Sequence, residues 1–252
     1  MSIFSILKHQ GQQFIPDITK PVLPEVFRGL PEITSKNCVT GCTICTEVCP
    51  TDAISMENRI SIDLGKCVFC GECATDCPEQ KIRFTNDYKI ASNDRKRLIV
   101  AEGVPTKITL DPAKVRAEIK SFFGSSLKLR QISAAGDNAD ENEMNACSNV
   151  NFDMGRYGID WVASPRHADG IVITGPISEH MALPTQICYD AIPFPKIVIL
   201  AGTNAISGGI FNDSKALNRS FLEQYPIDLY VPGYPPHPLT FINGVLEMIR
   251  SK

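Results

Sequence analysis

The sequence predicts two folded units in one chain of 252 residues: a small α+β unit rich in cysteine, then an α/β unit with a doubly wound parallel sheet. Eight of the ten cysteines fall between Cys38 and Cys77, in two runs that each close on Cys-Pro. Short strand segments separate and follow these runs. From residue 127 onward, apolar strand segments alternate with helical ones, which is typical of a parallel sheet covered by helices.

The cysteine runs predict iron-sulfur clusters. The second run, CVFCGECATDCP from Cys67 to Pro78, has the spacing C-x2-C-x2-C-x3-C-P. In this pattern three thiolates hold one four-iron cluster and the fourth reaches across to a neighbouring cluster. The first run, CVTGCTICTEVCP from Cys38 to Pro50, ends in the same way. We therefore expect two [4Fe-4S] clusters in a ferredoxin-like dicluster domain.

The crossover rule divides the eight thiols into two ligand sets. The first cluster is expected on Cys38, Cys42, Cys45 and Cys77, and the second on Cys67, Cys70, Cys73 and Cys49. One irregularity is the extra residue between Cys38 and Cys42, around Thr40-Gly41, where glycine can absorb the added turn. A disulfide framework or a zinc site is the alternative. Adjacent runs of four cysteines with trailing prolines fit both alternatives less well.

Composition excludes some classes of partner. The chain has 25 basic and 28 acidic residues and a formal net charge of -3, with no block of like charge. Nucleic-acid binding is therefore not expected. No apolar run approaches the roughly 18 residues that span a bilayer, and the N-terminus lacks the features of a signal peptide. We expect a soluble, intracellular protein whose thiols stay reduced.

Residues 1–32 are expected to form an N-terminal docking segment. Ile3, Phe4, Ile6 and Leu7 lie at helical spacing on one face. Such a helix can dock on a membrane or a partner, and packing on its own domain is the alternative. Residues 11–32 contain four prolines and predict an extended, wrapping segment.

Residues 33–92 are assigned to the dicluster domain and 93–126 to a linker. AISMENRISI predicts a hairpin that turns at Glu57-Asn58, and KIRFTNDY predicts a further short strand. In the linker, DPAKVRAEIKSFFG predicts one short helix. Asp111 would cap it, Pro112 would occupy its first turn and Gly124 would end it.

Residues 127–252 predict the doubly wound, flavodoxin-like sheet. The expected strands are LKLRQI, GIDWVA, GIVIT, KIVILAG and DLYVPG, and the expected helices are ENEMNACSNV, SEHMALPTQICYDAI and PLTFINGVLEMIR. In such sheets ligands lie beyond the carboxyl ends of the strands. The loops SAAGDNADENE, AGTNAISGG and VPGYPPHP follow the first, fourth and fifth strands, so a site is expected there.

These three loops, together with SPRHADGIVITGP, resemble the small electron-transfer subunit shared by respiratory complex I and the membrane-bound nickel-iron hydrogenases, including formate hydrogenlyase. The resemblance covers nearly all of residues 127–252. FRGLPEI and KCVFCGECATDCP resemble the two-cluster ferredoxin subunit of the same assembly. The resemblance implies large, catalytic-type and membrane subunits as partners, and a cytoplasmic position, peripheral on the inner face of the cell membrane.

The chain departs from the hydrogenase pattern where that family holds its proximal cluster. In the family, four cysteines in the three loops are the ligands of that cluster, whereas the matching positions here are Asp137, Asp140, Asn204 and Tyr234. Such side chains do not replace thiolates. Cys147 and Cys188 are expected to pack in the core. For Asp137, Asp140, Glu141 and Glu143, capping of the following helix is preferred over a hard-metal site or an acid-base pair.

The resulting functional hypothesis is an electron relay through two [4Fe-4S] clusters, with the C-terminal unit mainly a docking module. No catalytic residue is assigned: Arg166 and His167 are interpreted as interface or structural groups, and His9, His180 and His237 receive no chemistry. A soluble electron carrier is a further possible partner. The alternatives are a structural adaptor of a hydrogenase-related complex, or a C-terminal unit that binds flavin or nucleotide in the vacated crevice.

Overall fold

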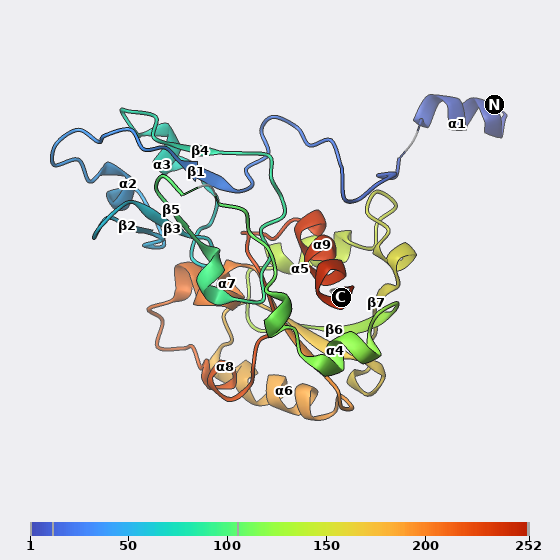
Figure 1. Ribbon diagram of the computed structural model, residues 1–252. Helices are drawn as coiled ribbons and strands as arrows, with labels where there is room; N and C mark the ends of the chain where they lie inside the picture. Colours follow the sequence, from blue (N-terminus) through green and yellow to red (C-terminus); the bar gives the residue numbers. More distant parts are fainter. Residues whose placement is uncertain (1, 12, 105, 251–252) are drawn as a thin grey trace.

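The computed structural model describes residues 2–11, 13–104 and 106–250. It contains a cysteine-rich unit of residues 31–101, here called the cysteine unit, and an α/β unit of residues 110–250, here called the sheet unit (Figure 1). A separate N-terminal helix projects away from both (Figure 1). Among the described residues, no helix combines the length and the apolar character needed to cross a bilayer.

The N-terminal helix α1 (Ile3–Gln10) begins at Ser2, whose side chain accepts a hydrogen bond from the Ser5 N–H, and it ends at Gly11. None of its residues is buried. Phe4 is 78% exposed and Leu7 58% exposed. The predicted amphipathic helix is therefore present, and in the structure it does not pack on its own domain.

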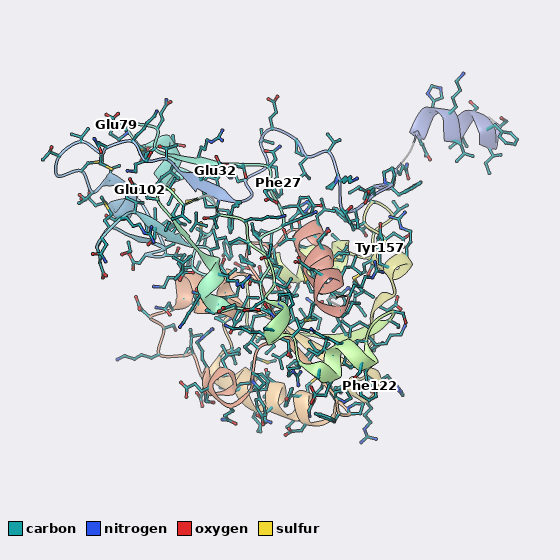
Figure 2. The ribbon with its side chains drawn as sticks, in the orientation of Figure 1. Phe27, Glu32, Glu79, Glu102, Phe122 and Tyr157 are labelled. Atoms are coloured by element: carbon teal, nitrogen blue, oxygen red, sulfur yellow. The ribbon has the colours of Figure 1, made fainter. Side chains whose placement is uncertain are left out.

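The proline-rich segment that follows runs along the sheet unit in extended form. The Ile15 N–H donates to the carbonyl of Asn151. Ile18 is buried, and its carbonyl accepts hydrogen bonds from the Tyr88 hydroxyl and the Asn243 amide. Phe27, labelled in Figure 2, packs edge-on against His237. These contacts tie residues 15–27 to the sheet unit before the chain enters the cysteine unit.

The cysteine unit contains two small antiparallel sheets and two short helices. Strand β1 (Pro31–Ile33) pairs with β4 (Ile82–Phe84), while β2 (Ile54–Ser55), β3 (Ser61–Asp63) and β5 (Ile99–Ala101) form a three-stranded sheet in that order. Helix α2 (Ile44–Glu47) and helix α3 (Glu72–Thr75) lie within the two cysteine runs. The predicted hairpin is the β2–β3 pair. The sequence placed residues 99–101 in the linker, whereas in the structure they form the third strand.

The sheet unit contains five parallel strands: β6 (Leu127–Ser133), β7 (Ile159–Trp161), β8 (Gly170–Thr174), β9 (Ile197–Ala201) and β10 (Leu229–Val231). Their spatial order is β10-β9-β8-β6-β7. With the strands numbered from the first, this is the flavodoxin-like order 2-1-3-4-5 read from the opposite edge. The predicted fold class is confirmed, and the switch point lies between β6 and β8.

Helices cover both faces of this sheet because alternate strand residues point to opposite sides. On one face Leu127, Ile199 and Leu229 pack with α4 (Ala117–Phe122), α5 (Ala139–Ala146) and α9 (Pro238–Ile249). On the other, Ile171 and Leu200 pack with α6 (Glu179–Asp190) and α8 (Ser220–Gln224). The short helix α7 (Thr203–Ser207) follows β9 and lies toward the cysteine unit (Figure 1). Neither α7 nor α8 was predicted.

The linker helix differs from its prediction. Asp111 caps a 3₁₀ turn, η2 (Pro112–Lys114), and the chain is extended at Val115 and Arg116 before α4 begins. The Arg116 guanidinium forms an ion pair with the buried Asp228, with Nε and Oδ1 2.7 Å apart. It also donates to the carbonyl of Lys196. This long-range pairing holds Arg116 out of the helix and divides the predicted helix in two.

The two units meet where β10 and α7 approach the second cysteine run. The backbones of Ser92 and Tyr230 exchange hydrogen bonds of 3.0 and 2.8 Å. The buried Thr203 hydroxyl donates to the carbonyl of Cys67 at 2.8 Å. A Cβ at Gly65 would lie 2.8 Å from the Ile206 side chain, so glycine allows the close approach. The second cysteine run is therefore held directly against the carboxyl end of the large sheet.

Replacing Arg116 by alanine is expected to destabilise the sheet unit, because it leaves the Asp228 carboxylate buried without its cation. Burial already raises the pKa of Asp228, even with Arg116 present. Loss of one partner of a buried pair costs about 3 kcal/mol, which lowers the thermal unfolding midpoint by several degrees. Arg83→Ala is the control, because its pair with Glu32 is exposed and contributes less than about 1 kcal/mol. If differential scanning calorimetry showed the same shift of the thermal midpoint for Arg116→Ala and Arg83→Ala, this account would be contradicted.

Candidate functional site

The first cysteine run forms an open loop that leads into α2. Gly41 has φ +76° and no atom within 4 Å of the position its Cβ would take. The extra residue between Cys38 and Cys42 is therefore absorbed by a left-handed turn that favours glycine. Cys45 lies buried in α2 beyond this loop.

The eight predicted thiols lie near one another, and Cys45 and Cys73, which belong to different predicted sets, are also neighbours. Burial raises the pKa of Cys45, and the neighbouring thiols of Cys38, Cys77 and Cys42 raise it further. Burial also raises the pKa of Cys67 to about 12, with Cys73, Cys49 and Cys70 as its thiol neighbours. Each fourth cysteine thus lies with the other run. All of these cysteines are free thiols.

Backbone N–H groups point at three of the sulfur atoms. Ala53 donates to the Cys49 Sγ at 3.2 Å, Phe69 to Cys67 at 3.3 Å and Lys81 to Cys77 at 3.3 Å. Hydrogen bonds of this kind favour the charged form of an acceptor. Hydrogen bonds to ligand sulfurs are among the features that set the reduction potential of an iron-sulfur cluster.

A small, largely enclosed cavity lies among Cys49, Cys67, Cys70 and Cys73. Its other walls are mostly apolar and include Ile54, Ile62 and Phe84. Among the described residues, no three His, Cys, Asp or Glu side chains converge on one metal ion. A four-iron cube needs its four thiolates apart, one on each iron. The free thiols, the N–H donors and the apolar cavity between the four sulfurs fit such a cluster.

The four positions beyond the ends of the large sheet also lie together. Tyr234 lies in the loop after β10 and Asp137 in the loop after β6. The Tyr234 hydroxyl donates a hydrogen bond to the Asp137 carboxylate. Burial raises the pKa of Tyr234 to about 12, and Asp137 contributes to the shift. Asp140 in α5 and Asn204 in α7 also affect the pKa of Tyr234. Side chains from three loops therefore meet at the carboxyl edge of the sheet.

Asp140 does not have the capping role that the sequence suggested. Asn138 is the N-cap residue and has a left-handed conformation, while Asp137 accepts a hydrogen bond from the Ala139 N–H. The Asp140 side chain points inward and is 1% exposed, and both of its oxygens lack a hydrogen-bond partner. Burial raises its pKa to about 8, helped by Glu141 and Asp137.

Asn204 and Glu141 complete this inner polar group. Asn204 is fully buried, and its amide makes no hydrogen bond of regular geometry. Glu141 accepts hydrogen bonds from Ser133 and Thr174 on one oxygen, both at 2.7 Å, while its other oxygen has no partner. The sequence analysis considered Glu141 only as one member of an acidic group at the start of a helix, because its burial is not visible in the local sequence. Its burial depends on the packing of α5 against β6 and β8.

An open cavity lies between Tyr234 and the second cysteine run. Phe69 and Cys70 line one side, and Glu143, Tyr234 and His237 line the other. Burial lowers the pKa of His237 to about 4, so this histidine is neutral at pH 7. It accepts a hydrogen bond from the Leu239 N–H at the start of α9, which is a structural role.

The remaining sequence candidates show no chemistry of their own. Cys147 is buried in the core of the sheet unit, and Cys188 borders the core on the other face. Arg166 and His167 lie in an exposed 3₁₀ turn, η4 (Pro165–His167). These positions are compatible with the packing and surface roles expected for them.

Both units of the chain match known protein families. Residues 138–248 match the family described as NADH ubiquinone oxidoreductase, 20 Kd subunit, and residues 31–81 match the 4Fe-4S dicluster domain. The chain is 32% identical over 135 residues to the probable membrane-bound hydrogenase subunit mbhJ of Pyrococcus furiosus, covering 54% of this chain and 81% of the relative. It is 34% identical over 146 residues to formate hydrogenlyase subunit 7 of Escherichia coli, covering 57% of each chain.

A chain of the solved membrane-bound sulfane sulfur reductase, an archaeal respiratory membrane complex, aligns over 50% of this chain and 72% of that chain. The sequence identity is 30% and the TM-score is 0.44. The chain spans less than two thirds of formate hydrogenlyase subunit 7 but most of mbhJ. The chain therefore belongs to the family of complex I 20 kDa subunits and membrane-bound hydrogenase subunits, and it carries a 4Fe-4S dicluster domain ahead of that unit.

Proposed function

We propose that this chain is an electron-transfer subunit of a membrane-associated, hydrogenase-like or complex I-like assembly, and that it relays electrons through two [4Fe-4S] clusters. The observation that carries the proposal is the grouping of the thiols, in which each cysteine run lends its last member to the other set. The first cluster would be held by Cys38, Cys42, Cys45 and Cys77, and the second by Cys67, Cys70, Cys73 and Cys49. Each cluster, when bound, supplies a one-electron carrier.

The residues that surround the first set of cysteines differ from those that surround the second. Around the second set, Ile54, Ile62 and Phe84 exclude water from the cavity between the sulfurs. Near the first set, the Lys81 side chain is 3% exposed and forms an ion pair with Glu102 at 2.5 Å. The same residue donates its backbone N–H to Cys77. The residue that contacts Cys77 of the first set therefore carries a buried ion pair, whereas the walls around the second set are mostly apolar.

The order of the relay follows from the contact between the units. Cys67 accepts the Thr203 hydrogen bond, and the cavity beside Cys70 reaches Tyr234. The first set lies on the far side of the cysteine unit. Electrons would therefore enter at the first cluster and leave from the second, toward the carboxyl edge of the large sheet.

That edge is where the hydrogenase pattern has its proximal cluster, and we propose that none forms here. Two carboxyls, an amide and a phenol occupy the four positions, and the Tyr234–Asp137 hydrogen bond joins two of them directly. Hard oxygen and amide groups do not hold an ordinary iron-sulfur cube. The next electron acceptor would then lie in another subunit, and this chain itself would be a non-catalytic component.

The sheet unit would act mainly as a docking module on the inner face of the membrane. Leu183 and Ile187 lie one turn apart on the outer face of α6 and are 66% and 60% exposed. Phe194, in the loop after that helix, is 73% exposed. Large apolar side chains gathered on one surface are typical of a contact with another subunit. The proposed partners are a large, catalytic-type subunit and membrane subunits of the assembly.

Single cysteine variants test the ligand sets. Anaerobic reconstitution is expected to give about eight iron atoms per chain, four for each cluster. Cys42→Ser is expected to remove the first cluster and Cys73→Ser the second, each lowering iron by about half as measured by iron and sulfide analysis. Cys147→Ser and Cys188→Ser are the matched controls and should retain both clusters. Iron far below two clusters in the native chain would favour a purely structural adaptor instead.

The docking surface is tested by the double variant Leu183→Asp with Ile187→Asp. Placing two charges in an apolar contact is expected to lower the amount of large subunit that co-purifies from solubilised membranes by tenfold or more, because desolvating each charge costs several kcal/mol. Phe122→Asp is the control, since Phe122 is 68% exposed on the separate helix α4 (Figure 2). Undiminished co-purification of the double variant, with its cluster content intact, would contradict docking through α6.

A further inference from the structure

The inner polar group at the sheet edge contains buried atoms that the protein leaves without partners. Both Asp140 oxygens, one Glu141 oxygen and both polar atoms of the Asn204 amide are in this state. Asp140 is 1% exposed, Glu141 7% and Asn204 0%. Unpartnered polar atoms at such burial are rare in folded proteins, and several in one place indicate that something else satisfies them.

The carboxyls around this group have one sign. Asp140 faces Glu141 and Asp137, and the Gly175 N–H lies near it without making a hydrogen bond of regular geometry. The nearby Arg219 guanidinium is engaged by carbonyls, those of Pro176, Asn204, Ala205 and Ile206. Burial and the neighbouring carboxyls therefore disfavour the charged form of Asp140.

Asp140 is linked to the second cysteine run by a short series of contacts. A Cβ on Gly202 would lie 2.3 Å from the Asp140 Oδ2, so the carboxyl rests directly on that glycine. The next residue, Thr203, donates its hydroxyl hydrogen bond to the Cys67 carbonyl. A charge gained on the cysteine side is therefore felt at Asp140 through a short, buried path where screening by water is weak.

Polar groups connect the neighbouring cavity to the vicinity of Asp140. Tyr234 lines that cavity, and its hydroxyl donates a hydrogen bond to the exposed Asp137. Asp137 is in turn close enough to Asp140 to raise its pKa. Glu143 lines the same cavity, and burial raises its pKa. Among the described residues no hydrogen bond joins these groups to Asp140, so a proton entering on this side crosses a gap at the last step.

We propose that Asp140 is a proton-binding site coupled to reduction of the second cluster. At a pH where Asp140 is ionised, reduction of that cluster by a low-potential one-electron donor would lower its charge by one, and the Asp140 carboxylate would take one proton from solvent to form an O–H bond. Oxidation of the cluster by the next acceptor releases that proton. The inference rests on the proposed function, because it requires the second cluster, and it adds proton movement at positions where the hydrogenase pattern has metal ligands.

The direct test is a potentiometric titration of the full-length, cluster-loaded protein with dithionite, followed by electron paramagnetic resonance at several pH values. In the native chain the midpoint potential of the second cluster is expected to be level at low pH and to fall with rising pH around the Asp140 pKa of about 8. Asp140→Asn mimics the protonated form, so its potential should match the native value at low pH and stay level. Asp213→Asn, which alters an exposed acid, is the control and should keep the native profile.

Each outcome of the titration has a defined meaning. A native profile in Asp140→Asn, or loss of the pH dependence in Asp137→Asn alone, would overturn the assignment. Tyr234→Phe should leave the equilibrium profile unchanged and slow proton uptake in a rapid-mixing experiment, since the hydroxyl is one of the polar groups that connect the cavity to the vicinity of Asp140. If the second cluster does not assemble in the native chain, the proposed function fails. If it assembles and its potential does not vary with pH, only this inference fails.

Unfolding experiments give a second readout that needs no redox change. The pKa of Asp140 in the folded chain is raised to about 8 from its ordinary value of 3.8. The native protein therefore loses stability as the pH rises from 3.8, the pKa of Asp140 in the unfolded chain, to about 8, its pKa in the folded chain. The reason is that the unfolded chain releases the Asp140 proton at a lower pH than the folded chain does. Asp140→Asn should remove this loss, giving a higher thermal midpoint than the native chain at pH 8 and a smaller difference at pH 5. A lower midpoint for the variant at both pH values would contradict a buried, proton-holding Asp140.

Discussion

The constraint on which the rest of the molecule depends is the burial of closely spaced thiols in a small folded unit. Its five short strands and two short helices enclose a core in which Cys45, Cys67 and Cys73 pack among aliphatic side chains. Burial raises the pKa of each of these three thiols. A bound metal adds to the stability of folded units of this size. The clusters that we propose would therefore support the fold as well as carry electrons.

The second constraint is the contact between the units. One hydroxyl, that of Thr203, and one pair of backbone hydrogen bonds, between Ser92 and Tyr230, place the second cysteine run at the carboxyl edge of the sheet. Parallel α/β sheets present their ligand sites at that edge. The fold therefore brings the second cysteine run to the edge where this chain has Asp137, Asp140, Asn204 and Tyr234. These side chains supply hydrogen-bonding and ionisable groups at that edge. We propose that they take the place of the proximal-cluster cysteines of the hydrogenase pattern.

Much of this organisation could be predicted from the sequence, and the failures have physical causes. Cysteine spacing and strand-helix alternation are local patterns, so the hairpin, the five strands and the fold class followed from them. The break at Arg116 depends on Asp228, which is 112 residues away, and a local helical pattern does not contain that ion pair. Asp140 resembled a helix-capping residue because its position near the start of α5 is visible in the sequence, whereas its inward orientation depends on the close approach to Gly202. Short α7 and α8 carry too few residues for a helical period to be recognised.

The most direct test of the central claim is a crystal structure of the anaerobically purified chain, with anomalous scattering measured at the iron edge. The account predicts two iron centres, one among Cys38, Cys42, Cys45 and Cys77 and the other among Cys67, Cys70, Cys73 and Cys49, with the second nearer to Thr203. It predicts no iron beside Asp137, Asp140, Asn204 or Tyr234. Zinc or disulfide bonds in place of the two centres, or a third iron centre at the sheet edge, would contradict it.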